Sequence, residues 1–474
     1  MIRLRLSTIA VLSVLVAPGE APAQAVAPHT AAPQVFTLEE ALEYAVDHYP
    51  TVKAALEQAN ASSAGVSVSR AAYLPRLDSL WQSNRGTANN IFGQMLPQSV
   101  IPAISGPVLP SASGDGVWGT AVGALLSWEP FDFGLRDAAV RGAGAAVVRA
   151  RADETLTRLD VQGAVGAAFL AVAAAERAVA ATQADVARRD VLARAAHTLA
   201  DNQLRPGAEA SRADAERATA QTRFLQARQT LALSQITMAR VLGLTAGQVS
   251  VNAASVLATL PAATPPRELA STHPLARVRE AAVDVARAQE DVLARTFRPR
   301  LYLQSSVFAR GSGANPDGRL DGRLDGLGLE RANWAAGVQV VFPNVFDFAS
   351  LRARRTAAAA STRAESARHD EALLMVTSQQ QAAAAMVVAA RAVAANTPVQ
   401  LAAAQQSEAQ ARARYEAGLA SIVEVADTQS LLAQAEYQDQ IARLEVWQAL
   451  LAEAIARGSL TSFVDLVRSP GGVR

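Results

Sequence analysis

The chain has 474 residues, half of them hydrophobic and only 5% aromatic, with 44 basic and 43 acidic side chains. Alanine dominates the apolar residues, so the chain buries surface mainly through small side chains. Because the two signs of charge are balanced and mixed along the sequence, no strongly basic surface is expected, and nucleic acid is excluded as a partner. There are no cysteines, which excludes disulfides and a lipid-bearing N-terminal cysteine.

Residues 1–25 are predicted to be a cleavable secretory signal. Two arginines precede an apolar run over 9–17, and the small-residue sequence Ala23-Gln24-Ala25 follows it, which is the usual layout of such a signal. Residues 26–35 are then an N-terminal extension. No later stretch approaches the roughly 18–20 uninterrupted apolar residues of a membrane helix. We therefore expect any membrane attachment to come from strands.

The rest of the sequence contains an internal two-fold repeat, with a first copy at 36–265, a second at 266–458 and a C-terminal tail at 459–474. The sequence Tyr73-Leu74-Pro75-Arg76-Leu77 is matched by Phe297-Arg298-Pro299-Arg300-Leu301. Further along, Phe131-Asp132-Phe133 is matched by Phe346-Asp347-Phe348 in the same order. A repeat of this length predicts one structural unit used twice.

Each copy begins with a helix that opens at a proline, Pro50 or Pro274, where the missing N–H is harmless. A strand hairpin follows, at about 77–130 in the first copy and about 300–343 in the second. Pro130 and Pro343 are predicted to end the second strands, because proline cannot donate to a strand ladder.

Very long helices follow the hairpins, at about 137–204 and about 349–415, and each would be on the order of 100 Å long. Valines seven residues apart, from Val165 to Val186, predict a coiled-coil seam. Returning helices are predicted at about 211–243 and 421–457. Each is too short to cover a long helix, so the simplest arrangement stacks two shorter helices end to end beside it.

Serines are predicted to cap both returning helices. Ser211 with Asp214, and Ser421 with Glu424, have the spacing of a capping box, in which the hydroxyl and the acid each accept a backbone N–H.

Aromatic residues concentrate in the hairpins, which hold four of the five tryptophans (Trp81, Trp118, Trp128 and Trp334). Aromatic girdles are typical of a barrel in lipid, although aromatic residues also favour the strands of a soluble sheet. Four strands cannot close a barrel, since known barrels begin at about eight strands. If the hairpins enter lipid, several copies of the chain must therefore share one barrel.

The opening Phe36-Thr37-Leu38-Glu39-Glu40-Ala41-Leu42, the paired hairpins and the segment from Tyr415 to Asp427 together resemble the TolC family of outer membrane efflux proteins. The resemblance implies a membrane α+β fold, with four strands per chain. In a homotrimer these form a 12-stranded outer-membrane β-barrel, continuous with a long α-helical coiled-coil tunnel through the periplasm of a Gram-negative bacterium. It also implies a periplasmic adaptor protein, an inner-membrane pump and outer-membrane lipid as partners.

The resemblance also places periplasmic tips at the turns between long and returning helices, where the adaptor docks. The residues concerned are Leu204, Pro206 and Gly207 in the first copy, and Tyr415, Gly418, Leu419 and Ser421 in the second. The first tip departs from the family's aromatic-x-x-Gly pattern. Gly207 and Gly418 are explained equally by tight turns.

Glu424 and Asp427 stand where the family has acidic residues that ring the periplasmic aperture. Three chains would bring six carboxylates to one constriction, which favours cations. Alternatively, Glu424 caps its helix and Asp427 is a solvated acid at the favourable end of the helix dipole.

No enzyme site, cofactor site or metal motif is predicted. The segment Asp317-Gly318-Arg319-Leu320 and its echo to Asp325 are interpreted as an external loop, with calcium binding as the alternative. The predicted function is a passive exit duct of tripartite efflux. An outlet for type I protein secretion and a non-conducting coiled-coil spacer of the envelope are the alternatives.

Overall fold

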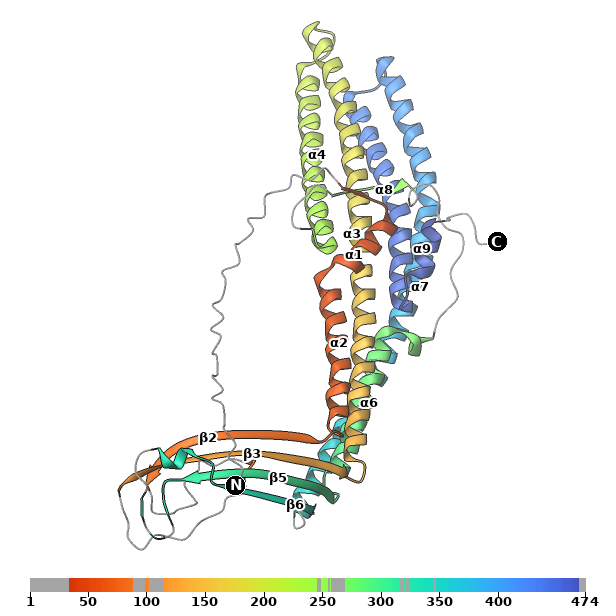
Figure 1. Ribbon diagram of the computed structural model, residues 1–474. Helices are drawn as coiled ribbons and strands as arrows, with labels where there is room; N and C mark the ends of the chain where they lie inside the picture. Colours follow the sequence, from red (N-terminus) through yellow and green to blue (C-terminus); the bar gives the residue numbers. More distant parts are fainter. Residues whose placement is uncertain are drawn as a thin grey trace.

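The computed structural model describes residues 34–87, 99–101, 114–244, 249–254, 256, 269–315, 317, 319–320, 324–343 and 347–468. The predicted signal peptide, most of the N-terminal extension and parts of the loop between Asp317 and Asp325 lie outside these residues. The described chain is a long bundle of helices with a four-stranded sheet at one end (Figure 1).

The two halves of the chain contain the main elements in the same order. The first half has β1 (Gln34–Phe36), α1 (Leu38–His48), α2 (Pro50–Ala71), β2 (Arg76–Thr87), β3 (Gly116–Phe131), α3 (Leu135–Asp201), α4 (Gly207–Leu242) and β4 (Val249–Val251). The second has η1 (Ala270–Thr272), α6 (Pro274–Arg295), β5 (Arg300–Ser312), η2 (Asp325–Leu327), β6 (Arg331–Val341), α7 (Phe348–Glu416), α8 (Ile422–Arg457) and α9 (Thr461–Arg468).

The long helices lie beside shorter ones, as the helix lengths predicted. Helix α3, of 67 residues, packs against both α2 and α4, and α7, of 69 residues, packs against α6 and α8. Figure 1 shows α2 and α4 following one another along α3. Both α2 and α6 begin at the predicted prolines, Pro50 and Pro274.

The two hairpins join into one antiparallel sheet of order β2-β3-β5-β6. The prediction that Pro130 ends its strand was wrong, because β3 continues to Phe131. The register between β3 and β5 shifts between Trp128 and Phe131. Pro130 therefore lies at an irregularity, one of the places where a strand tolerates a residue without an N–H.

One face of the sheet is mainly apolar, and the other combines polar residues with a small apolar cluster. Leu77 lies opposite Leu126, and Trp81 lies opposite Val122. Because successive side chains alternate between faces, this register places ten large apolar side chains on one side: Leu77, Trp81, Val122, Leu126, Leu301, Leu303, Val307, Trp334, Val338 and Val340. The other side carries the polar residues Asp78, Gln82, Asn84, Gln304, Ser306, Asn333 and Gln339, together with Leu80, Leu125 and Phe308, which pack with Ile101. Most of the apolar set is exposed in the single chain.

A buried ion pair fixes the point where β3 passes into α3. Asp132 accepts hydrogen bonds from the backbone N–H groups of Gly134 (3.0 Å) and Arg136 (2.6 Å) and from Nε of Arg136 (3.0 Å). Burial alone would raise the pKa of Asp132, but the hydrogen bonds from Arg136 and Gly134 outweigh it and lower the pKa. Arg136 also donates to the carbonyl of Ala72 at the end of α2 (3.1 Å), so the sheet and two helices are joined at one point.

The main core lies at mid-length and includes elements that sequence reasoning missed. Strands β1 and β4 pair in parallel, and α9 forms within the predicted tail. Phe463 of α9 is buried against Trp447 of α8, with ring centroids 6.0 Å apart. These additions widen the bundle at the level where α1 separates α2 from α4 (Figure 1).

Helices α3 and α7 each contain an 18-residue window apolar enough for a membrane span, with mean hydropathies of 1.6 and 1.4. The expectation of no such helix rested on uninterrupted apolar runs, whereas these windows reach the threshold by average. By length and composition alone they fit a span. Their packing along α2, α4, α6 and α8 assigns them to the helical bundle.

Candidate functional site

Both helix-to-helix turns lie at the end of the bundle far from the sheet (Figure 1), and their backbones match. Leu204 N–H donates to the carbonyl of Leu199, and Leu419 N–H donates to that of Arg414, both at 2.8 Å. The residue before each leucine has a positive φ, 58° at Gln203 and 78° at Gly418. Each long helix therefore ends in a Schellman motif, which satisfies its last carbonyls.

This geometry corrects the pairing of the tip glycines. Gly207 is the first residue of α4 and forms no part of the turn. The residue that corresponds to Gly418 is Gln203, which occupies the left-handed region despite its side chain, at a cost that glycine avoids. The same comparison pairs Leu204 with Leu419. Both side chains point into solvent, being 68% and 72% exposed.

The predicted capping boxes were wrong in different ways. Helix α4 begins at Gly207 with Pro206 as its N-cap, so Ser211 lies inside the helix. Ser421 is the N-cap of α8, as predicted, but its side chain makes no capping hydrogen bond. Glu424 instead forms an ion pair with Arg414 across the turn (2.9 Å). This ion pair competes with a hydrogen bond from the backbone N–H of Ser421 to the Glu424 carboxylate.

The two tips of one chain contact each other. Ile422, the first residue of α8, is buried in a cluster with Ala193 and Ala196 of α3 and Ala210 and Ala213 of α4. The structure thus brings α8 of one hairpin into the groove between the two helices of the other. Sequence reasoning did not identify Ile422, although it is a large apolar residue at a helix start.

Tyr415 adds a second contact between the tips. The Arg205 guanidinium lies over its ring, 5.5 Å from the centroid. Burial raises the pKa of Tyr415, and the nearby carboxylate of Glu209 raises it further, while Arg205 opposes this. The phenol therefore stays protonated well above neutral pH.

The two predicted aperture acids lie in the first turns of α8 and differ in their partners. Glu424 is half-buried and paired with Arg414. Asp427 is exposed and has no ion pair among the residues that the structure describes. Of the two predicted aperture acids, one is thus compensated by an arginine and the other is not.

A buried charge cluster, which the sequence analysis missed, lies farther from the tip. Arg189 of α3 contacts both oxygens of Asp185 (3.2 Å), Glu216 of α4 (2.7 Å) and the hydroxyl of Ser430 in α8 (2.7 Å). The side chains of Arg189 and Asp185 are only 3% and 6% exposed. Next to it, Arg188 pairs with Glu436 of α8 (3.0 Å). Three helices are therefore joined through one guanidinium.

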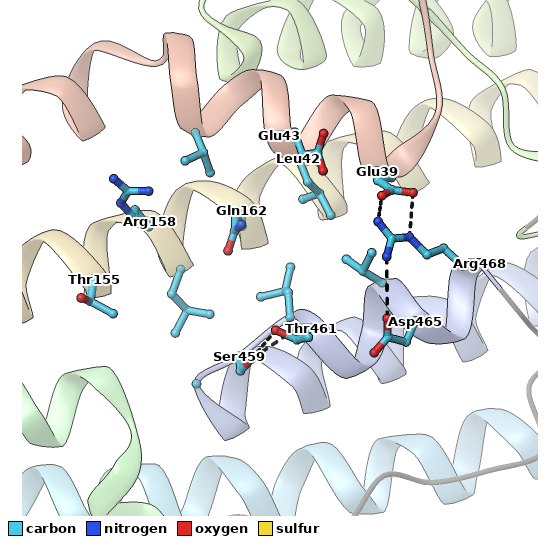
Figure 2. A pocket seen from close by; sticks show the side chains of 15 residues that line it. Glu39, Leu42, Glu43, Thr155, Arg158, Gln162, Ser459, Thr461, Asp465 and Arg468 are labelled. Atoms are coloured by element: carbon cyan, nitrogen blue, oxygen red, sulfur yellow. Dashed lines mark hydrogen bonds and ion pairs between the residues drawn. The ribbon is translucent and has the colours of Figure 1, made fainter. Parts of the chain in front are cut away.

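A pocket of about 420 Å³ lies between α1, α3 and α9. Figure 2 shows Arg468 reaching from α9 to Glu39 of α1, with Nε 2.9 Å from the carboxylate, and to Asp465. Arg158 on the opposite wall pairs with Glu154 (2.6 Å). Most charged side chains of the pocket are thus engaged in ion pairs, and the pair between Arg468 and Glu39 joins α9 to α1. This arrangement suits a structural joint better than a site of chemistry.

The fold matches solved outer-membrane proteins over nearly its whole length. The outer membrane protein VceC of Vibrio cholerae has a TM-score of 0.69 at 17% identity, covering 89% of this chain and 96% of that one. The CmeC outer membrane channel of Campylobacter jejuni has 0.69 at 12%, covering 91% and 89%. The open MtrE outer membrane channel of Neisseria gonorrhoeae has 0.68 at 17%, covering 89% of each chain.

No protein of curated function matches the sequence. The family model described as "Outer membrane efflux protein" matches residues 41–244 and 266–453. These segments include both long helices, both hairpins, the returning helix α4 and α8 up to residue 453. The chain therefore belongs to the outer membrane efflux protein family.

Proposed function

We propose that three copies of this chain form a passive duct across the outer membrane and the periplasm, the exit of a tripartite efflux system. Their 12 strands close one barrel, and their helices continue it as a tunnel. A helix of 67 to 69 residues is about 100 Å long, a length suited to crossing a periplasm. Energy then comes from an inner-membrane pump joined to the duct by a periplasmic adaptor.

The two-faced sheet is the observation that carries this proposal. Its mainly apolar face, with Trp81, Val307 and Trp334, suits lipid, and the polar residues of its other face, such as Gln82 and Gln304, suit a water-filled lumen. Within the described chain, the outer edges of β2 and β6 pair with no strand. Unpaired backbone groups cannot remain in hydrocarbon. Edge pairing between copies, β6 of one with β2 of the next, satisfies them.

The tips supply the adaptor site in this proposal. Leu204 and Leu419 are exposed apolar side chains on matching turns, so three chains would present six of them in a ring. Gly418 forms part of the second turn, Pro206 and Ser421 are the N-caps of the returning helices, and Gly207 is the first residue of α4. The Tyr415 ring and the Arg205 guanidinium hold the two tips together. An adaptor hairpin with apolar side chains at its own tip complements such a ring.

Replacing both tip leucines by serine is expected to weaken adaptor capture more than tenfold. Each buried leucine contributes about 1.5–3 kcal/mol, and two are lost per chain. The measurement is pull-down of the adaptor that serves this duct, with the trimer checked in parallel on gels. Leu269→Ser is the matched control, because Leu269 is 73% exposed but lies far from the tips in sequence and fold. Equal capture by the double variant and the control would show that the adaptor docks elsewhere.

Conductance tests the duct itself. The purified full chain, inserted in a planar bilayer in KCl, is expected to give discrete single-channel steps, since a continuous lumen runs through the proposed trimer. A non-conducting envelope spacer would leave the bilayer silent, and that result, obtained with a protein that inserts as a trimer, would refute the proposal. If the gene for this chain lies beside a gene for an ATP-driven transporter, that neighbourhood would instead favour type I secretion.

A further inference from the structure

A tube of three chains needs a helix junction between the two hairpins of each chain and another between neighbouring chains. The structure contains the first of these. Within the chain, α3 of the first hairpin packs against α8 of the second. Gly163 and Gly166 mark the closest approach, because a Cβ atom there would lie 2.8 Å from Ile455 and 2.9 Å from Leu451. Toward the tip, Arg188 and Arg189 bind Glu436 and Ser430 of α8. The junction within the chain is thus tight at one end and charge-linked at the other.

The matching turns provide a residue-by-residue correspondence between the two hairpins. The spacing in sequence that separates Gln203 from Gly418 also separates Gly243 from Gly458, the left-handed residues that end α4 and α8. The same spacing pairs Val161 with Val376 and Val172 with Val387, all of them buried. In this part of the bundle α3 therefore corresponds to α7, and α4 corresponds to α8.

The surfaces that correspond to the α3–α8 junction are bare in the single chain. Leu451, which meets Gly166, is 3% exposed, whereas its counterpart on α4, Ile236, is 65% exposed. Ala173 of α3 is 1% exposed, whereas its counterpart on α7, Val388, is 71% exposed. Residues at equivalent positions of the two hairpins are therefore buried at the α3–α8 junction and exposed to solvent on α4 and α7.

These bare residues form two stripes with helical spacing. The α7 stripe consists of Gln381, Ala385, Val388, Ala392, Ala395, Val399 and Ala403, and the α4 stripe of Gln221, Leu225, Gln229, Ala232 and Ile236. All are exposed. The stripes contain no charged residue. A soluble monomer would be expected to have polar residues in place of the apolar residues of these stripes.

The charges of the internal junction have no counterpart in the stripes or beside them. Arg188 corresponds to Ala403, and Glu436 corresponds to Gln221. The cluster around Arg189 is replaced as completely: Arg189, Asp185 and Glu216 correspond to Ala404, Gln400 and Leu431. All five of these charged residues thus have uncharged counterparts in the other half of the chain.

We propose that the α7 stripe of one copy packs against the α4 stripe of the next copy, in the register that α3 and α8 use within the chain. The partner is a second copy of this chain, and the inference rests on the proposed trimeric duct. In this register Ile236 faces Gln381, as Leu451 faces Gly166. The tube then alternates between junctions linked by charge inside each chain and uncharged, apolar junctions between chains.

Cysteine cross-linking tests the register on a clean background, since the natural chain has no cysteine. The full chain carrying Ile236→Cys and Gln381→Cys, purified in detergent and oxidised with copper phenanthroline, is expected to give covalent dimers and trimers on denaturing gels. Reductant should return them to monomers. Each single variant is a control. Ile236→Cys with Val399→Cys is the out-of-register control, because Val399 lies about 27 Å farther along α7, and it should stay monomeric on the gel.

The outcomes separate this inference from the duct itself. A protein that is trimeric by native mass spectrometry and conducts ions, but whose Ile236–Gln381 pair gives no covalent trimers, overturns the register and leaves the duct standing. Cross-linking of the out-of-register pair alone overturns it as well. A monomeric, non-conducting protein would instead remove the proposed function on which the inference rests.

Discussion

Substitution of Arg189 by methionine is expected to loosen the tip half of the bundle by about 3–5 kcal/mol, the usual cost of leaving a buried charge without its partner. Methionine keeps much of the side-chain volume but removes every donor. Asp185 is then left almost fully buried with no cation, and Glu216 and Ser430 lose the link that joins α4 and α8 to α3. Amide hydrogen exchange at the tip ends of α4 and α8 should accelerate accordingly, while exchange in the sheet should not change.

Arg188→Met is the matched control for this effect. Arg188 also bridges α3 and α8, but its side chain and that of Glu436 are 22% and 30% exposed, so solvent compensates and the cost is about 1 kcal/mol or less. Adding Asp185→Asn to Arg189→Met should recover part of the loss, because α3 then contributes no buried charge to this cluster. If Arg189→Met exchanged no faster than Arg188→Met, the cluster would not hold the hairpins together.

The sequence was sufficient to predict the architecture because its signals are local. Prolines at Pro50 and Pro274 start helices through backbone chemistry alone, and the long proline-poor alanine-rich stretches leave few alternatives to helix. The hairpins were predicted within a few residues for the same reason. Pro130 shows the limit, because its effect depended on the register with β5, a relation between distant segments that local patterns do not contain.

The tip illustrates why site details were harder to predict. The sequence Pro206-Gly207 predicted the position of the turn. The turn lies earlier in the chain, where Gln203 adopts a left-handed backbone conformation. Capping by Ser421 was plausible from spacing, but Arg414, ten residues before Glu424 and across the turn, takes the carboxylate instead. Ion pairs between helices, such as those of Arg189, depend on which faces meet, and spacing along one helix does not reveal this.

The structure changes most the ion selectivity expected of the proposed acidic ring of Glu424 and Asp427. If the ring consists only of Glu424 and Asp427, three chains supply six negative charges. The ion pair between Glu424 and Arg414 adds one positive charge per chain, which leaves a net of one negative charge per chain. The exposed carboxylate of Asp427 accounts for it. We therefore expect a moderate cation preference that responds to Arg414 as strongly as to either acid.

Single-channel reversal potentials in a KCl gradient should consequently follow a fixed order. Arg414→Gln should raise the cation preference above that of the natural protein. Glu424→Gln and Asp427→Asn should each bring it close to zero. The double variant leaves Arg414 unopposed and should turn the preference toward anions. A unit charge about 7 Å from an ion in a water-like dielectric shifts its energy by roughly 0.6 kcal/mol, so each step should change the permeability ratio severalfold.

Asp115→Asn, far from the tips in sequence and next to β3, is the control for a general charge effect. A double variant that remained as cation-selective as the natural protein would place the constriction away from Glu424 and Asp427, whereas the predicted reversal requires all three side chains to face the conducting path.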